Sequence, residues 1–187
     1  TLRKLGSPLQ GHPQIGLAGV EISSGSLGQG LSIANGIAMA ANLDSLKARV
    51  YCLMGDGETN EGQVWEAAMT SAHYKLDNLT AIIDNNKYQI DGKVEEIKNL
   101  APLAEKWKAF GWNVLACDGH KLEAISEAID KAGQTKGKPT IIIAETIKGK
   151  GVSFMEANPL DYHGKAPTAE EEKKAICEIC NIKELEL

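Results

Sequence analysis

The sequence predicts an α/β fold, a doubly wound and mostly parallel sheet with helices on both faces. The first observation is that strand patterns alternate with helical patterns along the whole chain. The second is that the strands are short apolar runs, of which P-T-I-I-I-A-E-T at residues 139–146 is the most pronounced. The third is that no internal repeat, low-complexity tract or linker divides the 187 residues. We therefore expect residues 1–187 to form a single domain.

A strand–helix–strand unit is predicted in the first half of the chain. Short apolar runs predict strands over residues 49–53 and 79–84, and the spacing of apolar residues predicts a helix over residues 61–74. Such a helix would be about 21 Å long and the second strand about 20 Å. Because the two lengths match, a right-handed crossover would return the chain to the edge of the sheet that it left.

Polar residues follow both strands of this unit. Asp56 lies in G-D-G, where Gly55 and Gly57 allow the backbone to approach a ligand closely, and Asn86 lies in N-N. Ligands of open α/β sheets bind at the carboxyl edge, so a carboxylate and an amide oxygen would converge there. Hard oxygen ligands favour Mg²⁺ or Ca²⁺. Alternatively, Asp56 is a turn residue of a common tripeptide and Asn86 only tolerates a strained backbone.

The remaining elements continue the alternation. Apolar residues at helical spacing predict helices over residues 26–43, 100–110, 122–132 and 169–182, and an apolar run predicts a strand over residues 112–117. Residues 10–30 hold six glycines and show no helical period before Leu27, so a long loop is expected there. Long ordered loops in compact domains are often functional. His120 lies in the turn between the last of these strands and the next helix, which predicts a capping or turn role for it.

Composition excludes several classes of function. Hydrophobic residues make up 43% of the chain and charged residues 24%, which is typical of a soluble globular protein. The formal net charge of −5 argues against a nucleic-acid surface. No apolar run reaches the ~18 residues that span a bilayer and no signal-peptide profile opens the chain, so we expect a cytoplasmic protein. Cys177 and Cys180 form a single C-x-x-C, which is weak support for a metal or redox site.

The joint occurrence of G-D-G at residues 55–57 and N-N at residues 85–86 resembles the thiamine-diphosphate-binding motif, and the surrounding sequence resembles transketolase. Further similar strings lie at residues 11–13, 19–30, 61–67 and 149–154 (G-H-P, G-V-E-I-S-S-G-S-L-G-Q-G, E-G-Q-V-W-E-A and G-K-G-V-S-F). The resemblance covers nearly the whole chain. It implies a thiamine-diphosphate-binding fold in which the cofactor diphosphate is held through a divalent ion. The metal ligands would be Asp56, the Asn86 side chain and the backbone carbonyl of Tyr88.

The resemblance also implies cofactor contacts in loops at the carboxyl edge. Besides Asp56, Asn86 and His163, these are Gly25, Ser26, Leu27, Gly55, Gly57, Ile90 and Lys148. Residues 25–27 would cover one side of the cofactor, although their glycine-rich setting also suits tight helix packing. Ile90 would contact a cofactor ring or pack as an ordinary apolar residue. Lys148 would bind the diphosphate, with a solvated surface charge as the alternative.

Three residues are implied in catalysis. His12 would face the thiazolium ring and the reacting sugar carbons, whereas the residues alone indicate a turn histidine. His163 would reach the cofactor diphosphate or the substrate. Histidine is suited to moving hydroxyl protons because its ordinary pKa is about 6.5. Glu61 would lie near the seam at which members of the family couple paired active sites.

The implied activity is the transfer of a two-carbon ketol unit between sugar phosphates, as in the pentose phosphate pathway. The family's N-terminal segment, with a serine–glycine–histidine motif, is expected to be truncated or missing here, and the family's pyrimidine-binding and C-terminal domains are expected to lie on another chain. We therefore expect the small subunit of a split transketolase. It would be inactive alone and would need a second subunit that carries those domains, with homodimeric pairing into a hetero-tetramer.

Three alternatives remain open. A 1-deoxyxylulose-5-phosphate synthase-like enzyme shares the metal motif, but the string at residues 19–30 favours transketolase. A non-catalytic cofactor-binding or assembly subunit would keep the pocket without turnover. A structural scaffold would have an empty carboxyl edge.

Overall fold

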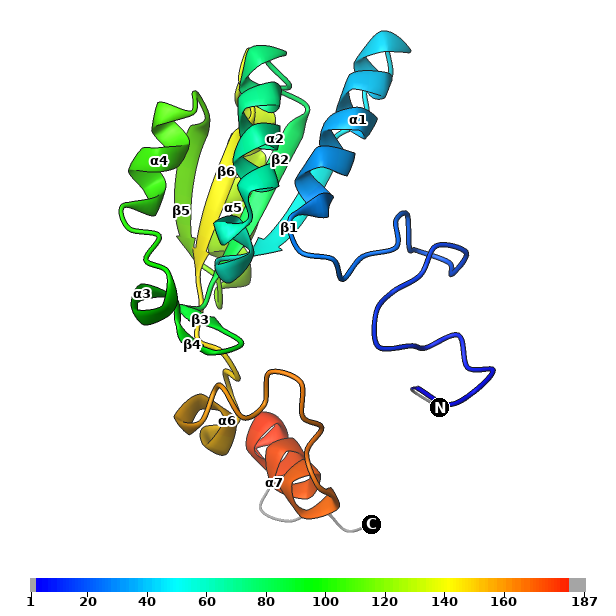
Figure 1. Cartoon of the computed structure of the whole chain (residues 1–187), viewed down its shortest axis with the longest axis vertical. Coiled ribbons are helices and arrows are strands. Elements are labelled where there is room, and N and C mark those ends of the chain that lie inside the picture. The colour runs from blue at the N-terminus through cyan, green and yellow to red at the C-terminus, as the bar shows by residue number, and fades with distance from the viewer. Residues whose placement is uncertain (1–2, 182–187) are drawn as a thin grey trace.

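The main sheet has four parallel strands in the order β1-β2-β6-β5. It belongs to a computed structural model that describes residues 3–181. The strands are β1 (Val50–Gly55), β2 (Leu79–Asn85), β5 (Asn113–Asp118) and β6 (Thr140–Glu145). Each was predicted from the sequence to within two residues at either end. All four carboxyl ends lie on one edge of the sheet (Figure 1).

Helices cover both faces of this sheet (Figure 1). The helices α1 (Gln29–Leu43), α2 (Gly62–His73) and α4 (Leu103–Ala109) lie on one face and α5 (Leu122–Gln134) on the other. On the first face Leu31, Val64 and Trp107 are fully buried in a core with Met54 and Ile83. On the second face a smaller core joins the small residues of α5 to β6. The predicted doubly wound α/β fold is confirmed.

The predicted strand–helix–strand unit is present as β1, α2 and β2. The register places Gly55 opposite Asp84, so the residues that follow the two strands lie at the same level. The unit differs from the prediction in two places. The strand β1 extends to Gly55, and a short 3₁₀ helix η1 (Gly57–Asn60) precedes α2, which begins at Gly62.

The N-terminal segment, residues 3–28, contains neither helix nor strand, and it includes most of the loop predicted over residues 10–30. The prediction that the following helix begins at residue 26 was wrong, because α1 begins at Gln29. The residue before it, Gly28, has a left-handed backbone with φ of 80°, and Gly25 has φ of 130°. These conformations favour glycine and are incompatible with an α-helix.

Smaller elements below the carboxyl edge were not predicted. They are the hairpin strands β3 (Tyr88–Gln89) and β4 (Gly92–Lys93) and the short helices α3 (Val94–Ile97) and α6 (Ser153–Ala157). The last helix, α7 (Ala169–Cys180), was predicted, but its expected end at residue 182 lies outside the described residues. Within residues 3–181 the helices are too short or too polar to cross a bilayer.

Candidate functional site

Asp56 lies directly after β1 and is anchored on both sides. Its N–H donates to the carbonyl of Asp84 (3.1 Å), which continues the β1–β2 ladder by one residue. The residue is only 1% exposed, and its carboxylate accepts two backbone N–H groups, from Gly57 (2.7 Å) and from Lys87 (2.6 Å). Burial raises the pKa of Asp56 above its ordinary value, while the two N–H groups oppose that rise. No ion pair of the described residues includes Asp56.

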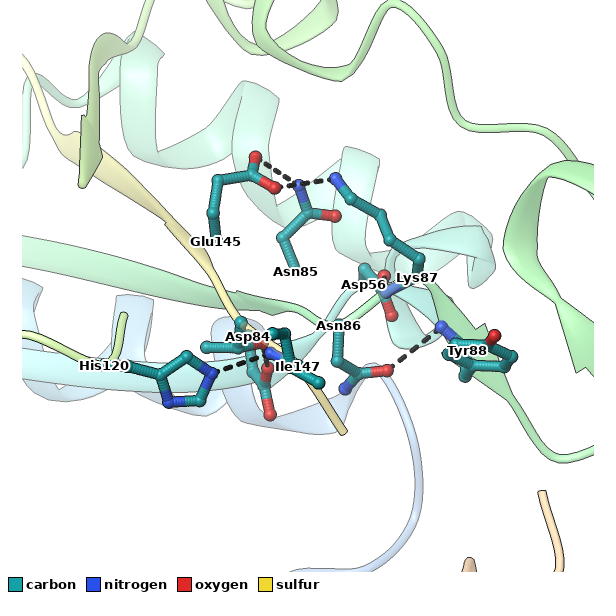
Figure 2. A network of polar contacts seen from close by, with 10 residues as sticks. Asp56, Asp84, Asn85, Asn86, Lys87, Tyr88, His120, Glu145 and Ile147 are labelled. Atoms are coloured by element: carbon teal, nitrogen blue, oxygen red, sulfur yellow. Dashed lines mark hydrogen bonds and ion pairs between the residues drawn. The ribbon is translucent and has the colours of Figure 1, made fainter. Parts of the chain in front are cut away.

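The turn after β2 brings a second set of polar groups to the same place. Lys87 has a left-handed backbone with φ of 71°, which is uncommon for a residue other than glycine and directs its N–H to Asp56. The side-chain oxygen of Asn86 accepts from the N–H of Tyr88 (3.0 Å). Figure 2 shows Asn86 and Tyr88 beside Asp56 and Lys87. The predicted convergence of the two strand ends is therefore observed.

These residues surround one cavity of about 770 Å³. It is lined by the predicted site residues Asp56, Asn86, Tyr88 and Lys148. Its other walls come from the end of β6 and from the segment between α3 and α4, including Glu145, Ile147, Asn99 and Leu100. The volume lies in the range of about 300–1,000 Å³ that is usual for small-molecule and cofactor sites.

The groups around the cavity fit a hard divalent ion. Asp56 offers a carboxylate, Asn86 an amide oxygen and Tyr88 a backbone carbonyl, and all three residues line the cavity. Each Asp56 oxygen accepts one N–H group and keeps a further lone pair. Residues 3–181 contain no cluster of three His, Cys, Asp or Glu side chains suited to a metal, so a zinc-type ligand set is not offered there. Mg²⁺ commonly takes one or two protein oxygens and completes its shell with water and phosphate.

The loop after β6 adds positive charge to this cavity. Lys148 lines it, and the ammonium of Lys148 lies 3.1 Å from Nδ1 of His163. Partial burial lowers the pKa of His163, and the neighbouring Lys148 lowers it further. A neutral imidazole can accept a hydrogen bond from the ammonium group, so His163 is connected to the cavity through Lys148 and does not line it itself. An anion such as a phosphate group would meet Lys148 there.

Comparison with known proteins identifies the family. A model of the transketolase thiamine diphosphate binding domain matches residues 1–181. The chain belongs to this domain family. It is 47% identical over 179 residues to one subunit of the apulose-4-phosphate transketolase of Phocaeicola vulgatus, covering 96% of this chain and 63% of that protein. It is 45% identical over 180 residues to the 6-deoxy-6-sulfo-D-fructose transketolase subunit of a Clostridium species, covering 96% of this chain and 65% of that protein.

Solved structures agree with this identification. The transketolase of Campylobacter jejuni superposes with a TM-score of 0.88 at 38% sequence identity, covering 97% of this chain and 29% of that one. This chain therefore spans less than two thirds of the two subunit relatives and under a third of the Campylobacter jejuni transketolase chain.

Several residues that the transketolase resemblance implied do not line the cavity. Gly25, Ser26 and Leu27 are exposed in the N-terminal segment, and Leu27 keeps 50% of its surface. His12 is exposed as well and lies against Gly25, where an added Cβ would come within 2.5 Å of the His12 ring. Ile90 lies in the turn of the β3–β4 hairpin with 63% of its surface exposed. Their contacts to cofactor and substrate stay predictions.

Gly55, Gly57 and Glu61 flank Asp56 without lining the cavity. The close approach at Gly57 requires glycine, because an added Cβ would lie 2.8 Å from the Cβ of Gln89 in the hairpin. Glu61 is exposed at the start of α2, with its backbone N–H donating to the carbonyl of Glu58 (3.0 Å). Its predicted role between paired active sites stays a prediction.

Three supporting residues were not assigned to the site by the sequence. Glu58 accepts the N–H of Gly55 (3.1 Å) and the N–H of Gly28 (2.8 Å), so it connects the end of β1 to the start of α1. The hydroxyl of Thr146 donates to the carboxylate of Asp84. The ring of His120 accepts the N–H of Ile147 (2.7 Å), a contact beyond the predicted capping or turn role. Position at a strand end is the one signal that they share with the predicted residues.

Proposed function

We propose that this chain is the diphosphate-binding subunit of a two-chain transketolase that transfers a two-carbon ketol unit between sugar phosphates. The observation that carries the proposal is the convergence of Asp56, Asn86, Tyr88 and Lys148 on one cavity in a domain of this family. The chain's 62–65% coverage of relatives that are themselves called subunits supports a divided enzyme.

Asp56, the Asn86 amide and the Tyr88 carbonyl would hold Mg²⁺, or Ca²⁺ in its place. The buried Asp56 carboxylate has no cationic side chain paired with it among the described residues, so a divalent ion would offset its charge. Lys148 would meet the diphosphate from the loop after the neighbouring strand β6. When bound, thiamine diphosphate supplies the thiazolium carbanion and the electron sink for carbon–carbon bond cleavage.

The histidines would move protons at the substrate. Partial burial and the neighbouring Lys148 lower the pKa of His163 and so favour its neutral ring, the form that can accept a proton from a substrate hydroxyl. His12 would act on the same substrate from the N-terminal segment. Gly25, Ser26, Leu27 and Ile90 would cover the cofactor rings, and Glu61 would couple paired sites. These exposed positions suit surfaces that a partner covers.

The partner would be a second subunit that carries the pyrimidine-binding and C-terminal domains. Homodimeric pairing of such two-chain units would give a hetero-tetramer, and we expect the assembly in the cytoplasm. The substrates would be sugar phosphates, because the ketol unit is taken from one phosphorylated sugar and given to another.

Reconstitution tests this proposal. The chain would be mixed with the polypeptide that co-purifies with it, and ketol transfer would be followed with thiamine diphosphate and Mg²⁺ present. We expect no turnover from either chain alone and turnover from the mixture. Full activity from this chain alone would contradict the two-chain proposal. Calorimetry with thiamine diphosphate, with and without Mg²⁺, would separate a cofactor-binding subunit from a scaffold, because a scaffold would release no binding heat.

A further inference from the structure

We propose that His120 is a positioning residue that fixes the loop after β6 and thereby sets Lys148 against the cavity. The proposal rests on the function proposed above, since it assigns Lys148 to the diphosphate. Nε2 of His120 accepts the backbone N–H of Ile147 at 2.7 Å, and Ile147 is the residue before Lys148 (Figure 2). His120 itself does not line the cavity, so it would act through the loop and not by touching a ligand.

Glu145, Thr146 and Ile147 are each hydrogen-bonded to a residue at or just after the end of a neighbouring strand. Glu145 accepts from the side-chain amide of Asn85 (2.7 Å) and pairs with Lys87 (2.9 Å). Thr146 donates to Asp84 in β2. These contacts all come from the β2 side. The contact to His120 comes from the β5 side, and it restrains the loop at Ile147, directly before Lys148 (Figure 2).

The ring of His120 is itself placed by the end of β5. The N–H of Gly119 donates to the carbonyl of Glu145 (2.8 Å), and an added Cβ at Gly119 would come within 2.5 Å of the Thr146 methyl carbon. The N–H of His120 donates to the carboxylate of Asp118 (3.0 Å), which also pairs with Lys121 (3.2 Å). The turn at residues 118–121 therefore packs closely against the β6 loop, and its hydrogen bonds fix the backbone that carries the imidazole.

Acceptance at Nε2 requires a neutral ring with its proton on Nδ1. A side chain without an acceptor at that point would leave the Ile147 N–H to water, and Gly119 would then restrain the loop from the β5 side only as far as Glu145 and Thr146. A catalytic or binding group that is displaced by about 1 Å can lose up to about 100-fold in effect. Because Lys148 stays present and charged, we expect a smaller loss of about tenfold in cofactor affinity, which corresponds to one hydrogen bond.

Two substitutions test the role of the acceptor. In the reconstituted two-chain enzyme with Mg²⁺ present, His120→Ala should weaken the binding of thiamine diphosphate about tenfold in calorimetry. His120→Gln should restore it, since the glutamine amide oxygen can reach the position of Nε2. Hydrogen exchange at the Ile147 amide should be faster in the alanine variant and return toward the wild-type rate in the glutamine variant. The exposed His73 at the end of α2 provides the matched control, His73→Ala, which should change neither measurement.

A double-mutant cycle tests whether the effect passes through Lys148. If it does, His120→Ala should cause no further loss of thiamine diphosphate affinity in a Lys148→Met background. An undiminished tenfold loss in that background, or unchanged affinity in His120→Ala itself, would overturn the positioning role while leaving the proposed function intact. A reconstituted wild-type two-chain enzyme that binds no thiamine diphosphate would overturn both proposals, so the two failures are distinguishable.

Discussion

The carboxyl ends of β1 and β2 and the N-terminal segment both carry predicted site residues, but the structure holds them very differently. Asp56 is 1% exposed and is bonded through its backbone and both carboxylate oxygens. His12 is exposed in a segment without helix or strand. The register of β1 and β2 fixes the position of Asp56 without help from a ligand or a partner chain. His12 lies where a ligand or a partner chain would have to complete the site.

Removing the carboxylate at the sheet edge should have the largest effect. Asp56→Ala deletes a proposed metal-binding residue. Loss of a residue that only supports a metal-binding side chain already costs about 10–100-fold in metal affinity. We therefore expect a loss of more than about 100-fold in Mg²⁺-dependent thiamine diphosphate binding. Calorimetry would measure it. The exposed Asp91 in the β3–β4 hairpin gives the control Asp91→Ala, which should bind normally. Equal affinities of the two variants would remove Asp56 from the site.

The N-terminal segment should show the opposite pattern. His12→Ala should lower the turnover of the reconstituted two-chain enzyme by about 100-fold, the lower end of the range for a lost acid or base. Thiamine diphosphate affinity should stay within about twofold, because His12 does not line the cavity. Turnover equal to that of His73→Ala would exclude His12 from the mechanism.

Glu58 connects the two regions, and its loss should cost stability. Glu58→Ala removes the acceptor of the Gly55 and Gly28 N–H groups, both of which are partly shielded from water. Leaving such groups unpaired costs about 1–3 kcal/mol. Thermal unfolding of Glu58→Ala should show a midpoint lower by several degrees. Glu61 is nearby but exposed, so Glu61→Ala should leave the midpoint unchanged. An unchanged midpoint in Glu58→Ala would mean that the start of α1 is held by other contacts.

The smallest effect concerns the titration of His163. Partial burial and the nearby Lys148 both disfavour the protonated ring, so its pKa lies below the ordinary value. In Lys148→Met the like charge is gone, and the midpoint of the His163 ring signal in an NMR pH titration should move upward. A downward movement or none would show that the ammonium and the ring are apart in solution.

The contrast between the two regions also explains what could be predicted. Apolar runs and matched element lengths predict β1, β2 and the crossover between them. They also predict that Asp56 and Asn86 lie at the same edge of the sheet. The start of α1 does not, because Gly28 takes a left-handed backbone that is tied to Glu58, 30 residues away. No local pattern encodes that contact.

The loop after β6 shows the same limit at a functional position. Lys148 could be selected by its place after a strand and by family resemblance. The bond between His120 and Ile147 spans 27 residues and depends on the β5–β6 neighbourhood, so the turn sequence around His120 did not indicate it. Contacts between adjacent parallel strand ends depend on the strand order, which apolar runs alone do not reveal.

A crystal structure of the chain with Mn²⁺ and thiamine diphosphate would test the central claim most directly, through the anomalous signal of the metal. We predict one peak at the carboxyl edge, coordinated at about 2.1 Å by the Asp56 carboxylate, the Asn86 amide oxygen and the Tyr88 carbonyl, with the diphosphate completing the shell. A diphosphate bound elsewhere, or bound without a metal at these three oxygens, would contradict it.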